Sequence, residues 1–241
     1  AEEKGNVTVG AISADILRGG DNGSDRGVES AMGNLIADVT LWATSGQNAP
    51  AAVASTSPTA SAPVTDIAFM NPGGLRADLH YGTDGAVTYR DVASVQPFAN
   101  TITTMTLTGA QIKSVLEEQW QPEGASRPKL HLGVSEGFSY TYVEEAPRGE
   151  HIVSMTLNDL AASYTVAANS FLAGGGDNFT TFAAGTNRAD AGQADLSATV
   201  AYFAAHPVVD PAPLGRATLA VTEPTPEPTP TPIPESVLAD M

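Results

Sequence analysis

The stretch Asp-Ile-Ala-Phe-Met-Asn-Pro-Gly-Gly-Leu-Arg (66–76) joins a predicted strand to a loop of unusual composition. Residues 66–70 have the character of a buried strand and are followed by turn residues. The glycines of the loop allow a close approach of the backbone to a ligand, and Arg76 can present a planar fork to phosphate or hydroxyl groups. Taken alone, Asn-Pro-Gly-Gly is also an ordinary turn. Other parts of the sequence are therefore needed to distinguish an ordinary turn from a ligand-binding loop.

Further strands and helices are predicted on both sides of this stretch. Strands bounded by turn residues are expected at 101–107, 138–143, 152–157, 164–168 and 217–221. Apolar residues at helical spacing predict helices at 29–44 and 194–205, one that follows a cap at Thr108 and runs to Trp120, and a short one at 90–95. Several strands follow one another without a helix between them. The pattern favours an α+β fold with mixed β-sheets and flanking helices.

Composition narrows the classes of function. The formal net charge is −16, from 27 acidic and 11 basic residues, and no basic run is present. A nucleic-acid polymer would be repelled, because such binding needs clustered cations. A small phosphorylated ligand stays possible, since one or two arginines can reverse the local field. Cysteine is absent, which excludes disulfides, thiolate nucleophiles and cysteine-type zinc sites.

The domain organisation is read from composition. Residues 1–221 are expected to form the globular part, which a chain of 241 residues can fill with one good core. Residues 222–241 begin with alternating proline and threonine or glutamate, which predicts an extended spacer or tail. Residues 47–63 are expected to form a surface loop. No apolar stretch is long enough to span a membrane, and the first residues do not resemble a signal peptide, so a mature fragment or excised domain without membrane insertion is expected.

Three more polar segments occur where predicted elements begin or end. Residues 26–34 precede a helix, and Arg26 alone would be read as part of a solvated helix start. In Gln-Pro-Phe-Ala-Asn (96–100), Phe98 alone would be assigned to the core. Asn-Ser-Phe-Leu-Ala-Gly-Gly-Gly-Asp-Asn-Phe (169–179) offers a ring, an open backbone and a carboxylate. Asp177 can accept hydrogen bonds from two vicinal hydroxyls, but a glycine turn with a capping aspartate explains the segment equally well.

Catalytic and metal-binding patterns are not found. The loop at 169–179 lacks the lysine of a phosphate-binding loop and does not match a dinucleotide-binding fingerprint. The histidines are expected at the surface or in loops rather than as metal ligands; they are His80, His131, His151 and His206. We therefore predict no catalytic residue and no metal ligand in this chain.

The polar segments, taken in order, resemble the C-terminal domain of 5′-nucleotidases and of the related UDP-sugar hydrolases and cyclic-nucleotide phosphodiesterases. The resemblance rests on 29–38, 66–79, 96–100, 169–179 and the helical Thr-Gly-Ala-Gln-Ile-Lys-Ser-Val-Leu-Glu-Glu-Gln (108–119), and it covers roughly 6–220. Each motif is weak alone, whereas their shared order is specific. The resemblance implies a layered α+β sandwich that holds the nucleoside.

The resemblance also implies roles for individual residues. Phe98 and Phe171 match the pair that sandwiches the base, and Asp177 matches the aspartate that binds the ribose hydroxyls. The other residues of the expected substrate site are Asn71, Arg76 and Arg26 beside ribose and phosphate, Asn100 near the base, and Gly175 and Gly176 in the glycine loop.

The same family implies a division of labour between two domains. Two divalent metal ions and the catalytic groups belong to an N-terminal metallophosphoesterase domain, so this chain needs no cofactor of its own and is expected to be inactive alone. The resemblance and the spacer together suggest an exported, secreted or cell-wall-associated bacterial hydrolase acting in nucleotide catabolism. The alternative from another class is a non-catalytic cell-surface module for protein or glycan, in which Phe98 and Phe171 would pack in the core.

Overall fold

The computed structural model describes residues 2–45 and 64–220, so the predicted loop at 47–63 and the predicted tail at 222–241 lie outside the described residues. The helices are α1 (Glu2–Gly5), α2 (Ala31–Thr44), α3 (Tyr89–Val95), α4 (Gly109–Glu117), α5 (Ser170–Ala173) and α6 (Asp195–Ala205). The short 3-10 turns are η1 (Asp21–Gly23), η3 (Pro72–Gly74), η4 (Gly176–Asn178) and η5 (Thr180–Ala184). Within the described residues, no helix has the length and apolar character that a membrane span requires.

The strands form three sheets. Five strands make the central sheet in the order β5 (Gly133–Val134), β2 (Ile67–Met70), β8 (Ser163–Asn169), β4 (Thr101–Thr108) and β9 (Thr186–Ala194). A second sheet has the order β10 (Val208–Val209), β1 (Thr8–Ile12) and β3 (Ala86–Thr88), and a third has β11 (Ala217–Leu219), β6 (Tyr140–Tyr142) and β7 (Ile152–Met155). Each sheet contains both parallel and antiparallel pairs, which confirms the α+β expectation.

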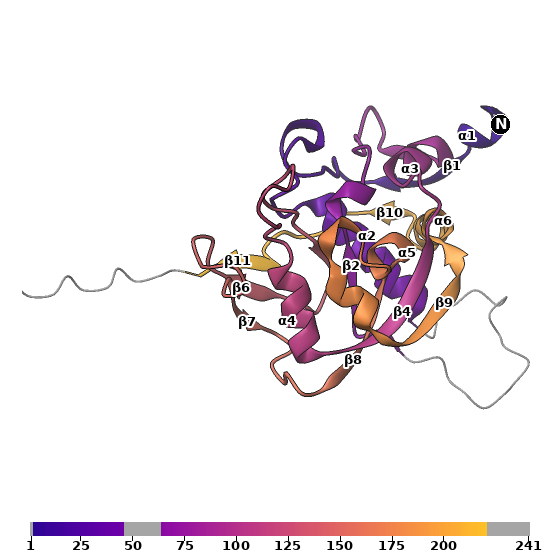
Figure 1. The fold of residues 1–241 in the computed structure, drawn as a ribbon. Coiled ribbons are helices and arrows are strands. Elements are labelled where there is room, and N and C mark those ends of the chain that lie inside the picture. The colour runs from indigo at the N-terminus through magenta and orange to yellow at the C-terminus, as the bar shows by residue number, and fades with distance from the viewer. Residues whose placement is uncertain (1, 46–63, 221–241) are drawn as a thin grey trace, which may run out of the picture.

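The central sheet separates two hydrophobic cores. Successive side chains of a strand point to opposite faces. In β2, Ala68 and Met70 pack into one core with α2 and α6, whereas Ile67 and Phe69 pack into the other with α4. All four positions are buried, which explains why this strand reads as a continuous apolar run. In Figure 1, α4 and the β11-β6-β7 sheet lie to one side of the central sheet, and α6, α3 and β1 lie to the other.

Local capping chemistry sets where the main helices begin. The Ser30 hydroxyl accepts a hydrogen bond from the Gly33 N–H and starts α2. Thr108 starts α4 through a reciprocal pair of bonds with Gln111, which confirms the predicted cap. The chain therefore passes directly from β4 into α4, which packs against the sheet.

Strand directions gather three polar loops at one edge of the central sheet. β2 and β8 are parallel, with Ile67 opposite Val166, so both strands end at the same edge. β4 runs antiparallel to β8 with Ile102 opposite Asn169, so its first residues lie at that edge too. The segments that follow β2, precede β4 and follow β8 are consequently neighbours.

Several strands are absent from the prediction. β9 is the clearest case, because most of its side chains are exposed and it shows no regular alternation of apolar residues. It pairs with β4 through two register irregularities, which further weaken any sequence period. The strands β1, β3, β5 and β10 are short, with two to five residues each. Such strands are held by backbone hydrogen bonds to a neighbouring strand, and their side chains leave no recognisable pattern in the sequence.

Candidate functional site

A cavity of about 390 Å³ opens at the edge where the three loops meet, a volume within the usual range for small-molecule sites. Among the predicted site residues, those that line it are Arg26, Asn71, Phe98, Asn100, Phe171 and Asp177. Gly73 and Gly74 of the loop after β2 complete the lining, and the predicted Arg76, Gly175 and Gly176 lie outside it. Segments from four parts of the chain therefore converge on one cavity.

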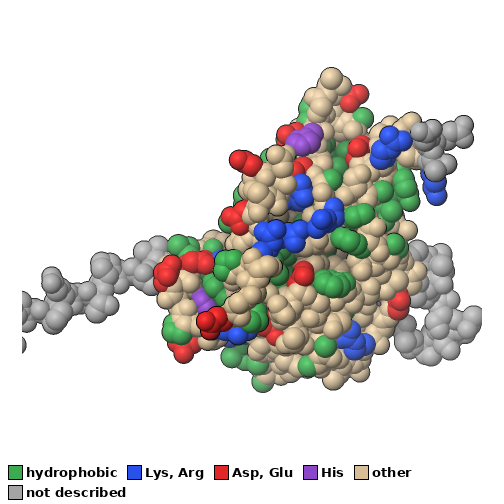
Figure 2. Space-filling model, turned by 45° about the horizontal axis from the view of Figure 1, so that its top comes forward, with side chains coloured by type: hydrophobic (Ala, Val, Ile, Leu, Met, Phe, Trp, Pro, Cys, Tyr) green, Lys and Arg blue, Asp and Glu red, His purple; other side chains and the backbone are tan. Residues whose placement is uncertain are grey.

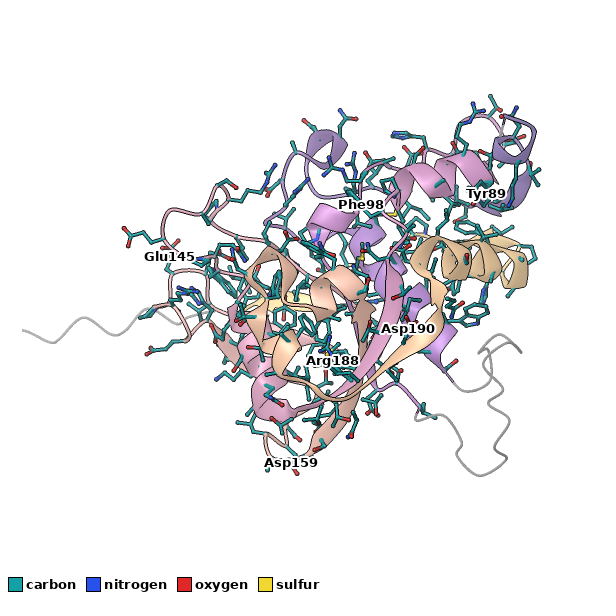
Figure 3. All side chains as sticks on the ribbon, turned by 45° about the vertical axis from the view of Figure 1, so that its right-hand side comes forward. Tyr89, Phe98, Glu145, Asp159, Arg188 and Asp190 are labelled. Atoms are coloured by element: carbon teal, nitrogen blue, oxygen red, sulfur yellow. The ribbon has the colours of Figure 1, made fainter. Side chains whose placement is uncertain are left out.

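Two phenylalanine side chains give the cavity its aromatic character. Phe98 lies in the loop between α3 and β4 and is 55% exposed, and Phe171 in α5 is 49% exposed. The assignment of Phe98 to the core on local grounds is therefore wrong. Neither ring stacks on another aromatic ring within the described part of the chain, and both line the cavity. Figure 3 shows Phe98 at the upper edge of the sheet, at the opposite end of the long strands from Asp159.

The glycine loop supports the Phe171 ring. A Cβ atom placed on Gly176 would lie 2.5 Å from Cε1 and Cζ of Phe171, so the ring rests directly on the glycine backbone. Gly175 has a φ of 89°, in the left-handed region that favours glycine. These two predicted residues thus shape the loop and seat the ring without lining the cavity.

Asp177 is held by a chain of amide side chains. The Asn71 Nδ2 donates to Asp177 Oδ2 at 2.7 Å, and Asn71 Oδ1 accepts from Asn169 Nδ2 at 2.9 Å. Asn71 and Asn169 are almost fully buried, at 1% and 4% exposure. The Asn169 Oδ1 also accepts from the Leu172 N–H and so caps α5. The carboxylate of Asp177 is therefore fixed in place before any ligand binds.

Backbone conformation at Asp177 is unusual and is supported from the segment after α4. Asp177 and Asn178 have φ values of 56° and 65°, a region in which Asp and Asn are the best-tolerated residues after glycine. Gln121 donates to the Asp177 carbonyl at 3.2 Å and accepts from Asn178 Nδ2 at 2.8 Å. Sequence reasoning assigned no role to Asn169 or Gln121. An Asn three residues before Leu172 is a visible cap signal, whereas nothing in the sequence points to Gln121.

Two arginine side chains lie beside the loop that follows β2. Arg26 is half-buried, and a Cβ on Gly73 would lie 3.4 Å from one of its terminal nitrogens. Arg76 is exposed, with its guanidinium carbon 5.9 Å from the centroid of the Phe98 ring. Burial lowers the pKa of Arg26, and the positive charges of Arg127 and Arg76 lower that pKa further while Asp177 raises it. Figure 2 shows a band of Lys and Arg side chains across the face it draws, an exception on an acidic protein.

Two of the histidines are buried. His131 and His151 lie in loop segments, in agreement with the expectation of a surface or loop position, and each is only 4% exposed. Burial lowers the pKa of His131 to about 4, and the charge of Lys129 lowers it further. His151 hydrogen-bonds Glu117 at 3.2 Å. Among residues 4–45 and 64–220, His, Asp and Glu side chains form no group of three or more that would hold a metal ion.

The site combines two open ring faces, one fixed carboxylate and a neighbouring cationic side. Such a set can hold a planar ring by stacking, accept hydrogen bonds from hydroxyl groups and attract an anion. The fold and the site together are consistent with a domain that binds a small ligand. The family model described as "5′-nucleotidase, C-terminal domain" matches residues 5–184, and the chain belongs to this family.

Curated relatives and solved structures agree with this assignment. A 5′-nucleotidase-related protein of Glossina morsitans morsitans is 29% identical over 230 residues, which is 90% of this chain and 39% of the relative. A cell wall protein of Listeria monocytogenes is 27% identical over 73% of this chain and 22% of its own length. The crystal structure of a 5′-nucleotidase precursor from Thermus thermophilus superimposes with a TM-score of 0.73 at 30% identity, over 92% of this chain and 41% of that one. The chain thus spans well under half the length of these relatives.

Proposed function

We propose that this chain is the substrate-binding domain of a secreted 5′-nucleotidase-like phosphoester hydrolase and that its cavity binds a nucleoside or nucleotide. In this proposal the base lies between Phe98 and Phe171, and Asp177 accepts hydrogen bonds from the ribose hydroxyls. The observation that carries it is the placement of two half-exposed rings and one fixed carboxylate around a single cavity.

The remaining groups of the site support a phosphorylated ligand. Arg26 lines the cavity, and Arg76 lies beside the Phe98 ring. Among the described residues, Asp177 is the one carboxylate in the cavity lining, and its charge acts on Arg26. Arginine keeps its charge at all working pH values and forms paired hydrogen bonds with phosphate. Asn100 lines the same cavity as Phe98 and Phe171, and in this proposal it contacts the edge of the base. Stacking on a ring contributes about 1–3 kcal/mol per base, so these polar groups are needed for useful affinity.

Hydrolysis itself is assigned to a different part of a longer protein. In this proposal the two divalent metal ions are held by an N-terminal metallophosphoesterase domain, as the family implies, and this chain alone does not hydrolyse its ligand. The share of the relatives that this chain covers supports such a larger parent. The coding sequence upstream of Ala1 tests this: a metallophosphoesterase domain there is expected, and an unrelated domain contradicts the proposal.

Export to the cell surface of a bacterium belongs to the same proposal. It is supported by the Listeria relative, whose name places it in the cell wall, and by the Thermus relative, which is described as a precursor. Fractionation of cells that make the full-length protein should recover it outside the cytoplasm.

The alternative of a protein- or glycan-binding module is less well supported. It expects Phe98 and Phe171 to pack in the core, yet about half of each side chain is exposed. Nothing else in the described residues favours it over a nucleoside site.

Ligand-dependent thermal unfolding tests the proposed function. Adenosine and AMP at millimolar concentration should raise the melting temperature, because a ligand that binds only the folded state stabilises it, whereas ribose alone should not. Phe171→Ala should weaken binding about 5- to 150-fold, which corresponds to the loss of one stacking partner. Leu160→Ala is the matched control, because this exposed side chain lies in the loop before β8, at the far end of the strand. No shift with any nucleoside would overturn the proposal.

A further inference from the structure

Asn100 holds a position from which it can select among bases. It precedes β4 and lines the cavity together with Phe98 and Phe171. An asparagine amide presents an acceptor oxygen on one side and a donor nitrogen on the other. The atom that faces the ligand therefore decides which hydrogen-bonding groups the site accepts.

Asp195, the first residue of α6, fixes this amide. Asn100 Nδ2 donates to Asp195 Oδ2 at 3.4 Å, and the Asp195 N–H donates to the Asn100 carbonyl at 2.9 Å. Asp195 is only 5% exposed, and its other oxygen accepts from the Leu196 N–H at 2.7 Å. A second contact ties the same segment to α6, because the Thr199 hydroxyl donates to Gln96 Oε1 at 2.6 Å. Both the backbone and the side chain of Asn100 are thus held by one helix.

The chemistry of the partner sets the orientation of the amide. Oxygen and nitrogen of an asparagine are assigned from their hydrogen-bond partners. An ionised carboxylate only accepts hydrogen bonds, so the amide nitrogen must point toward Asp195. The Asn100 Oδ1 accepts no hydrogen bond from the other described residues. It remains available to the cavity as an acceptor.

We propose that Asp195 is a positioning residue that orients Asn100 as a hydrogen-bond acceptor and thereby selects bases with an exocyclic amino group on the facing edge. This inference rests on the proposed nucleoside site. Adenine and cytosine carry such an amino donor, whereas hypoxanthine, guanine and uracil carry a carbonyl at the equivalent place. A carbonyl facing Asn100 Oδ1 would leave two acceptors opposed and unpaired, which disfavours binding.

Matched nucleosides test the inference by isothermal titration calorimetry. Adenosine and inosine have the same size and sugar and differ at the amino or carbonyl edge of the base; cytidine and uridine form a second pair. The titrations are run at pH 8, because burial raises the pKa of Asp195 and the carboxyl group must be ionised. We expect adenosine to bind about tenfold more tightly than inosine, the value of one net hydrogen bond.

Two variants separate positioning from simple stability. Asp195→Asn keeps the shape but lets the Asn100 amide adopt either orientation, so the preference for adenosine should fall to about equal affinities. Asn100→Ala should remove the preference in the same way and serves if Asp195→Asn does not fold. Asp190→Asn is the control, because the side chain of this exposed β9 residue bonds only the Gly192 N–H among described residues, and its variant should keep the tenfold preference.

The outcomes discriminate between the two levels of the proposal. Equal binding of adenosine and inosine by the unaltered protein overturns the selection by Asn100 and leaves the nucleoside site standing. A preference that survives in both Asp195→Asn and Asn100→Ala also overturns it. Absence of binding by every nucleoside overturns the site and the selection together.

Discussion

Replacing Gly176 with alanine is expected to weaken nucleoside binding while leaving the domain folded. The added Cβ would lie 2.5 Å from two carbons of the Phe171 ring, whereas carbon atoms rest at about 3.5–4.0 Å. The ring must therefore retreat by roughly 1 Å or more. Its outer face is open, so it can move, but it moves into the space that the base would fill. Gly176 lies outside the left-handed region, so its backbone tolerates a side chain.

The size of the effect follows from the stacking contribution. Contact with one ring is worth about 1–3 kcal/mol per base. A displaced ring should forfeit about 1–2 kcal/mol of this, which raises Kd for adenosine roughly 5- to 30-fold. Calorimetric titration gives the Kd, and thermal unfolding without ligand checks that the melting temperature stays close to that of the unaltered protein.

Two other glycines of the loop supply controls. At Gly174 an added Cβ would meet only backbone oxygens, at 3.3 Å from Ser170 and 3.5 Å from Phe171, so Gly174→Ala should bind nearly normally. At Gly175 the φ of 89° makes alanine strained, so Gly175→Ala should lower stability. Unchanged affinity in Gly176→Ala, or an equal loss in Gly174→Ala, would show that the Gly176 backbone does not position the Phe171 ring.

Three further substitutions test buried contacts of the domain. Asn71→Ala leaves the buried Asn169 amide without its oxygen acceptor and should cost about 1–3 kcal/mol in urea unfolding, with weaker adenosine binding; an unchanged midpoint would contradict this. His131 has a pKa of about 4 when folded against 6.5 as its ordinary value, so the unfolded chain binds more protons between these values. Stability should fall by about 3 kcal/mol as the pH drops from 6.5 to 4, and His131→Gln should flatten that slope in melts at several pH values. The Glu117 carboxylate accepts a hydrogen bond from the Ile152 N–H at 2.7 Å. Glu117→Ala removes this acceptor and should lower the melting temperature clearly more than Glu117→Gln, which keeps an acceptor oxygen. Equal effects of the two substitutions would show that this hydrogen bond does not stabilise the fold.

Several buried elements could be predicted because burial leaves apolar residues in their sequence. β2 lies between two cores and reads as an apolar run, and α2 is buried at most of its positions. β9 could not be predicted in this way, since backbone pairing with β4 places it and its side chains face solvent. The exposure of Phe98 could not be predicted from the neighbouring residues either, because it depends on the conformation of the loop before β4 and not on the residue type.

The hydrogen bonds between the residues of the site could not be predicted from the sequence. The bonds from Asn71 to Asn169 and to Asp177 join residues 98 and 106 positions apart, and they exist because β2 and β8 run parallel and end together. The resemblance in motif order named residues that line the cavity. It did not show that Asn71 holds Asp177, or that Asp195 reaches Asn100. Such contacts follow from topology and register, which a local pattern does not encode.

A crystal structure of the domain with adenosine would show whether the cavity binds a nucleoside. We expect the base between the rings of Phe98 and Phe171, with the ribose hydroxyls on the Asp177 carboxylate. A bound adenosine located elsewhere, or one inside the cavity with its ribose away from Asp177, would contradict it.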